Sequence, residues 1–130
     1  MDTGLTESRK ELIAGFGEKG LAEAIKPLSR EIYLFDTYIA GTTYLKDASV
    51  LDQIKEGDRL LMQREDNRFD GNAIMVLNES KQKLGYVPEK DNIVFARLMD
   101  AGKLLCGKIR RIEKKGSFKL INIEIYLIDF

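Results

Sequence analysis

Two long β-like stretches near the end of the chain constrain its fold most strongly. In residues 118–130, Ile121, Ile123, Ile125 and Leu127 alternate with polar or aromatic residues. A period of two is typical of a β-strand with one buried face. Residues 103–112 form a second β-like stretch, and the polar turn at 114–117 joins the two. The sequence therefore predicts two long strands at the end of the chain.

Shorter β-like stretches precede this pair. Strands are predicted at 31–40, 59–63, 73–77 and 83–87 because these stretches are rich in β-branched, aromatic and leucine residues. The connection at 45–54 is expected to include a helical turn, and residues 56–58 to form a turn. Residues 89–100 have the apolar spacing of a helix that ends at Gly102. The pattern predicts a mainly β fold, a small β-barrel of about six strands with one inserted helix.

The first 30 residues have a different character. Leu12, Ile13 and Phe16 recur at helical spacing, and several glycines divide the segment into two short helices. We predict an N-terminal helical extension over residues 1–30 and a barrel domain over residues 31–130. The extension is interpreted either as a helix that packs on the barrel, which we favour, or as an arm that binds a partner.

Composition excludes several classes of protein. Lys plus Arg and Asp plus Glu number 21 each, so the formal net charge is zero, unlike proteins that coat duplex nucleic acid. There is no histidine, which rules out histidine-based zinc sites and Ser-His-Asp triads. Cys106 is the single cysteine, as expected for a cytoplasmic protein without disulfides. Neither a signal peptide nor a membrane span is expected.

A polar loop between the strands at 59–63 and 73–77 is the first candidate for a binding site. The turn Asp70-Gly71 would suffice to reverse the chain, yet residues 65–69 precede it. Phe69 in this loop and Tyr44 at another strand end can stack on nucleic-acid bases. Asp70 can accept hydrogen bonds from a terminal sugar hydroxyl and would repel a phosphate, and the phosphate-binding candidates are Arg64 and Arg68.

Structural roles would explain the same residues. Asp70 would then form an Asx-turn, Phe69 would plug an end of the barrel, and the asparagines would cap the loop. No feature of the sequence supports catalysis: there is no phosphate-binding glycine loop, and Cys106 lies in an apolar strand as a small core residue would. We predict no enzyme, no catalytic residue, no metal site and no cofactor.

Three segments together resemble a HIRAN domain. They are residues 35–44 (FDTYIAGTTY), 64–74 (REDNRFDGNAI) and 84–88 (LGYVP). The match runs from about Tyr33 to the C-terminus and leaves out the N-terminal extension. HIRAN domains are OB-like barrels that occur in Swi/Snf-type remodelling ATPases and as short free-standing bacterial proteins. The resemblance thus implies a small OB-like β-barrel.

The resemblance also implies a ligand, the 3′ end of single-stranded DNA. By resemblance, Asp70 binds the terminal hydroxyl. Stacking aromatics fall on Tyr44 and on Phe69, which stands where other members have tyrosine. The loop asparagine falls on Asn67, and a further aromatic of the groove on Phe118.

Two positions depart from the family pattern. Thr43 stands in place of a phosphate-binding arginine, and Tyr86 in place of a histidine that contacts phosphate. Phosphate anchoring is therefore weakened, and compensation would have to come from Arg64, Arg68 or Lys90.

The sequence supports one main hypothesis and two alternatives. The main one is a non-enzymatic DNA-binding module that recognises the free 3′-hydroxyl of single-stranded DNA and contacts a DNA-processing protein through its N-terminal arm. The first alternative is a protein-interaction barrel with little affinity for DNA, which Thr43 and the zero net charge favour. The second is a nuclease, which would require a metal-binding carboxylate cluster near Asp66 and Asp70.

Overall fold

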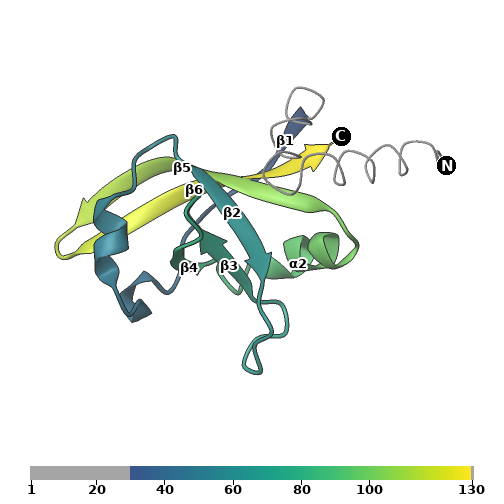
Figure 1. The fold of residues 1–130 in the computed structure, drawn as a ribbon, viewed down its shortest axis with the longest axis horizontal. Coiled ribbons are helices and arrows are strands. Elements are labelled where there is room, and N and C mark those ends of the chain that lie inside the picture. Colours follow the sequence, from purple (N-terminus) through teal and green to yellow (C-terminus); the bar gives the residue numbers. More distant parts are fainter. Residues whose placement is uncertain (1–29, 130) are drawn as a thin grey trace. The chain divides into compact units, whose positions relative to one another are not determined.

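The computed structural model describes residues 30–129, of which Glu31–Ile128 form one compact unit. The helical extension predicted at the N-terminus lies in residues 1–29, outside the described residues, and stays a prediction. Within residues 30–129, six strands, one α-helix and two short 3₁₀ helices follow one another (Figure 1). In order they are β1 Arg30–Tyr38, η2 Thr42–Tyr44, η3 Ala48–Asp52, β2 Arg59–Arg64, β3 Ile74–Leu77, β4 Lys83–Tyr86, α2 Asn92–Asp100, β5 Leu104–Lys115 and β6 Phe118–Asp129.

All six strands belong to one sheet, in the order β1-β6-β5-β2-β3-β4. The terminal hairpin predicted from the sequence is its longest element: β5 and β6 pair antiparallel from Leu104 opposite Ile128 to Lys115 opposite Phe118. The pairs β2–β5, β2–β3 and β3–β4 are antiparallel as well. A mainly β fold with one helix between the fourth and fifth strands is confirmed.

The sheet curls until its two ends meet. Just after β1, the backbone N–H of Ala40 donates to the carbonyl of Tyr86 at 2.8 Å, and the N–H of Tyr86 donates back at 2.9 Å. This bridge joins the β1 end of the sheet to β4. It brings the backbones close together at Gly85, where an added Cβ would lie 2.4 Å from the carbonyl oxygen of Ala40. Glycine is therefore required at the point where the sheet closes.

The core fills the inside of the curled sheet. Ile121, Ile123 and Ile125 are fully buried, as their alternation in the sequence predicts, and Leu127 is partly buried. They pack with apolar residues of the other strands, while Phe95 and Ala96 cover the core from α2. Burial of a side chain of this size contributes about 1.5–3 kcal/mol relative to exposure. The core thus provides a rigid support for the loops between strands.

The helix begins later than the sequence pattern suggests. The prediction started it at residue 89, but the N–H of Asp91 donates to the carbonyl of Pro88 in a turn, and α2 begins at Asn92. The Asp91 carboxylate does not cap the helix, because it accepts a hydrogen bond from the buried hydroxyl of Thr37 at 2.9 Å.

No helix within residues 30–129 is long and apolar enough to cross a membrane.

Cys106 is buried in β5 with 3 % of its surface exposed, as expected for a core residue. Burial raises the pKa of its thiol, and nearby Arg59 opposes this effect only in part. Because the thiolate is the reactive form, we expect the native protein to react with an aromatic disulfide reagent about a hundredfold more slowly than the urea-unfolded chain. Absorbance of the released thiol measures both rates. Equal rates would show that the thiol is accessible in the folded state.

Candidate functional site

The loop between β2 and β3 consists of two consecutive turns. In the first, the N–H of Asp70 donates to the carbonyl of Asn67 at 3.3 Å; in the second, the N–H of Ala73 donates to the carbonyl of Asp70 at 3.2 Å. The side chain that begins each turn also accepts from the backbone two residues on: Asn67 from Phe69 at 2.8 Å, and Asp70 from Asn72 at 2.9 Å. The expected Asx-turn and asparagine cap are both present.

The reversal of the chain is displaced by one residue from its predicted place. The sequence suggested Asp70-Gly71 as the central pair of the turn, whereas the hydrogen bond from Ala73 to Asp70 places Gly71 and Asn72 at the centre. The reason is the Asx-turn, which makes Asp70 the first residue of the reversal. As a result, the Asp70 carboxylate lies at the junction of the two turns.

Phe69 is largely exposed to solvent. Its side chain is 83 % exposed, so the expectation that it plugs an end of the barrel is wrong. It occupies a central position of the first turn, where the backbone directs the side chain away from the core. The guanidinium carbon of Arg68 lies 5.1 Å from the centre of the ring, a cation–π distance. The loop thus presents an exposed aromatic ring with a positive charge beside it.

Asp70 is held from the side of the helix. One carboxylate oxygen, Oδ2, accepts a hydrogen bond from Nδ2 of Asn92 at 2.8 Å, and Asn92 is 2 % exposed at the start of α2. The other oxygen, Oδ1, accepts from the N–H of Asn72. An ionised carboxylate has about four acceptor positions, so roughly two remain for a ligand. Asp70 is thus oriented by the protein while keeping the capacity to bind a donor.

Arg64 clamps the loop from within. Its Nη1 and Nη2 donate to the carbonyls of Ala73 and Gly71 at 2.7 and 2.8 Å, and its Nε donates to Asp100 Oδ1 at 2.9 Å. Hydrogen bonding to this guanidinium lowers the pKa of Asp100. Of the five donors of an arginine, most are engaged inside the protein. Arg64 was predicted to contact phosphate; its observed contacts give it the role of shaping the loop.

Tyr44 lies on a different element from Phe69 and is similarly exposed. Gly41, in the left-handed conformation at φ 74°, ends the extended chain after β1 and leads into η2. Tyr44 at the end of η2 is 88 % exposed, and Thr43 beside it is exposed too. Tyr44 borders a hollow of about 420 Å³ whose lining also includes Lys83 of β4. A second stacking surface is therefore available next to β4.

A hydrogen-bonded network connects this hollow to the loop. Lys83 Nζ donates to the Tyr86 hydroxyl at 2.5 Å, and that hydroxyl donates to Glu65 Oε2 at 2.7 Å. Glu65 Oε2 also accepts from Asn67 Nδ2 at 3.1 Å, and Asn67 holds the backbone of Phe69. Two of these residues, Glu65 and Lys83, were not among the predicted site residues. Of the predicted residues, the network joins Tyr86 and Asn67.

The two remaining candidates lie in different places. Lys90 is two residues before Asn92; its Nζ lies 3.3 Å from Asp91 Oδ2 and 5.6 Å from the Tyr38 ring centre. Phe118 begins β6 opposite Lys115. Because Leu61 of β2 pairs with Cys106, β2 runs towards the start of β5, and the loop lies at the other end of β5 from Phe118 (Figure 1). No described contact joins Phe118 to the loop.

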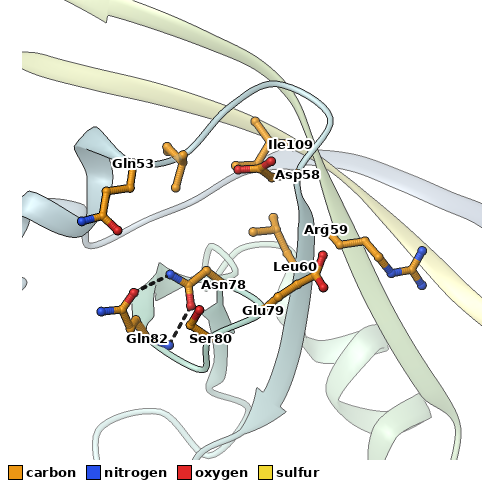
Figure 2. Close-up of a pocket in the computed structure, with 10 residues that line it drawn as sticks. Gln53, Asp58, Arg59, Leu60, Asn78, Glu79, Ser80, Gln82 and Ile109 are labelled. Carbon is orange, nitrogen blue, oxygen red and sulfur yellow. Dashed lines mark hydrogen bonds between the residues drawn. The ribbon is translucent and has the colours of Figure 1, made fainter. Parts of the chain in front are cut away.

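Another hollow lies at the opposite end of β2. This cleft, of about 250 Å³, lies between the start of β2, the β3–β4 turn and the segment after η3, and Figure 2 shows the residues that line it. The side chains of Asn78 and Gln82 on its wall bond to each other at 2.8 Å, and Asn78 Oδ1 accepts from the N–H of Gln82. Its polar groups thus close a turn, and it contains none of the predicted site residues.

The described residues also bear on the nuclease alternative. Residues 30–129 contain no group of three or more His, Cys, Asp or Glu side chains arranged to hold a metal ion. In particular, the Asp70 carboxylate is engaged by Asn92 and Asn72 rather than by other carboxylates.

Comparison with protein families supports the resemblance found in the sequence. The family model described as the HIRAN domain matches residues 32–127, which include β2, the loop, η2 and β4. The chain belongs to the HIRAN family. The HIRAN domains are a family of nucleic-acid-binding domains, and as such they are binding rather than catalytic modules. No curated protein was found to match the chain.

Two solved structures share the fold of this HIRAN domain. A protein from Lactobacillus plantarum is 27% identical, with a TM-score of 0.73, over 78% of this chain and 99% of its own. The HIRAN domain of human HLTF is 17% identical, with a TM-score of 0.61, over 78% of this chain and 79% of its own. The latter likeness establishes the curled β-sheet architecture, consistent with the OB-like fold that the sequence suggested.

Proposed function

We propose that this HIRAN domain binds the 3′ end of single-stranded DNA and recognises its free 3′-hydroxyl through Asp70. The observation that carries the proposal is the pairing of Phe69 and Asp70 at adjacent positions of one clamped loop. Phe69 is almost completely exposed, while Asp70 is oriented by Asn92 and Asn72. A stacking surface is thus placed next to a fixed hydrogen-bond acceptor.

The charge on Asp70 explains the choice of terminus. A 3′-hydroxyl donates a hydrogen bond to a carboxylate, and a hydrogen bond to a charged group contributes about 1.5–3 kcal/mol. A 3′-phosphate has no comparable donor and places a second anion against the carboxylate, which is repulsive at short range. Because Asn92 and Arg64 hold the loop in place, the carboxylate does not swing away to relieve the repulsion.

Stacking supplies the part of the affinity that does not depend on base identity. Phe69 and Tyr44 are both largely exposed, and base–aromatic stacking contributes about 1–3 kcal/mol per base. Arg68 over the Phe69 ring adds a positive charge next to the stacked base. Since Thr43 carries no charge, we assign backbone phosphate contacts to Arg68 and Lys90, whereas Arg64 maintains the loop.

Anisotropy titrations with short labelled oligonucleotides test the proposal. We expect the wild-type protein to bind a 3′-hydroxyl end about 10- to 100-fold more tightly than a 3′-phosphate end, from the energy of the charged hydrogen bond. The Asp70→Asn variant keeps the shape of the side chain but loses its charge, so we expect the ratio to fall to about twofold. Asp66→Asn removes an exposed carboxylate of the same loop and is expected to keep the wild-type ratio.

The result that would overturn hydroxyl reading is equal binding of both ends by the wild-type protein. A thermal melt of each variant separates loss of recognition from loss of folding. The contacts that hold the loop through Arg64 do not involve the Asp70 side chain, so we expect the Asp70→Asn protein to remain folded.

A protein-interaction barrel is the second candidate. It is favoured by the formal net charge of zero, by the uncharged Thr43 and by the internal engagement of Arg64. In that case the exposed rings of Tyr44 and Phe69 would contact a protein, together with the arm in residues 1–29. Absence of measurable binding to either oligonucleotide, with the domain folded, would favour this candidate over DNA-end recognition.

A further inference from the structure

We infer that Lys83 binds a backbone phosphate of the bound strand between the two stacking surfaces, in addition to the phosphate contacts of Arg68 and Lys90, and that Glu65 weakens this contact by competing with the phosphate. The inference rests on the proposed function and adds two residues to it. It starts from a deficit of positive charge available to phosphate, because Thr43 and Tyr86 carry no charge and Arg64 is engaged within the protein.

The position of Lys83 fits this role. Its Nζ lies 4.2 Å from the centre of the Tyr86 ring and donates to the Tyr86 hydroxyl at 2.5 Å. An ammonium group has three donors, so about two remain for other partners. The Lys83 side chain is 40% exposed, and its Nζ is 4.0 Å from Glu65 Oε1, at the limit of an ion pair. The cation is thus placed by Tyr86 but not neutralised by a close carboxylate.

Lys83 also lies between the two stacking surfaces. On one side it lines the hollow that Tyr44 borders. On the other side, Tyr86 and Glu65 connect it to Asn67, which holds the backbone of Phe69. A strand whose bases stack on Tyr44 and Phe69 must carry its backbone from one of these places to the other. The Nζ of Lys83 is therefore close to the expected course of a phosphate.

Glu65 carries the opposite charge at the same point. Its carboxylate accepts from the Tyr86 hydroxyl and from Asn67, and it is the nearest anion to Lys83 in the network. A phosphate that approaches Lys83 meets the charge of Glu65 as well, and it must compete with Glu65 for the Tyr86 hydroxyl. Neutralising Glu65 while keeping its acceptor oxygen should therefore strengthen binding.

Two substitutions measure these effects by anisotropy with a short oligothymidine that ends in a 3′-hydroxyl. Lys83→Met is expected to weaken binding about fivefold, as for a partly exposed charge pair. It should also reduce the slope of log affinity against log salt by about 0.7, the value for one phosphate on a single strand. Glu65→Gln is expected to tighten binding about fivefold. Lys55→Met, in the exposed turn before β2, is the control for loss of one positive charge.

The outcomes separate this inference from the proposed function. If the wild-type protein prefers the 3′-hydroxyl end but Lys83→Met behaves as Lys55→Met does, the assignment of Lys83 is overturned while end recognition stands. If Lys83→Met weakens binding and both ends bind equally, the phosphate contact stands and hydroxyl reading fails. Unchanged or weaker binding by a folded Glu65→Gln protein would overturn the inference that Glu65 competes with the phosphate. No binding by the wild-type protein would overturn both proposals.

Discussion

Replacing Gly85 by alanine is expected to lower the free energy of unfolding by about 2–3 kcal/mol, the range for strong overpacking. A Cβ at this position would lie 2.4 Å from the carbonyl oxygen of Ala40 and 2.6 Å from Cγ2 of Ile39. The first atom belongs to the backbone and the second to a buried core side chain, so neither can move freely. The bridge between Ala40 and Tyr86 must open or shift, and with it the closure of the sheet. Urea titration followed by circular dichroism measures the change.

Gly71→Ala provides the matched control. No atom lies within 4 Å of the Cβ that this substitution adds. Its effect on the free energy of unfolding should lie within about 0.5 kcal/mol of zero, as for most surface substitutions. If Gly85→Ala is as stable as Gly71→Ala, the inference that the sheet closure leaves no room for a Cβ at residue 85 is wrong. Amide exchange gives an independent reading, because the N–H groups of Ala40 and Tyr86 should lose protection in Gly85→Ala.

Removing the two exposed rings is expected to have the largest effect on ligand binding. Tyr44→Ala and Phe69→Ala should each weaken binding of single-stranded DNA by about 1–3 kcal/mol, which is the range for loss of one stacked base. The rings lie on different elements, η2 and the β2–β3 loop, so we expect the double variant to show about the sum of both effects. Anisotropy with the oligothymidine described above measures each affinity.

Stability measurements on the same variants give the necessary control. Because both rings are more than four-fifths exposed, their removal should leave the melting temperature nearly unchanged. Phe118→Ala is a useful comparison, since Phe118 is another exposed aromatic but lies at the far end of β5 from the loop. We expect it to change binding by less than about twofold. Equal losses for Phe118 and Phe69 would indicate non-specific contacts rather than a stacking site.

The fold was largely predictable because its strands have strong local signals. The alternation of Ile121, Ile123 and Ile125 places three buried side chains on one face, and the structure buries all three. The helix boundary was predicted less well. Asp91 occupies the N-cap position of α2, but its carboxylate accepts a hydrogen bond from Thr37, 54 residues earlier in the chain, instead of capping the helix. A contact that distant leaves no local pattern, so only the tertiary structure reveals it.

The contrast between what the sequence predicted and what only the structure showed is sharper in the candidate site. The sequence by itself predicted the HIRAN family, which the family model confirms, and drew attention to the long polar loop with Phe69 and Asp70, because residue types and short spacing carry that information. The hydrogen bonds of Arg64, Glu65 and Lys83 became visible only in the tertiary structure. A regular strand places residues three apart on opposite faces, so nothing local suggests that Lys83 would reach Tyr86.

The orientation of Asp70 depends on the tertiary structure in the same way. The carboxylate is held by Asn92, a residue of α2 that is distant in sequence from the loop. The sequence suggested Phe69, Asp70 and Tyr44 as candidate binding groups, since residue type and local spacing are properties of single residues and their neighbours. The tertiary structure decided which of them are engaged within the protein and which face solvent, because that depends on how the curled sheet brings β2, β4 and α2 together.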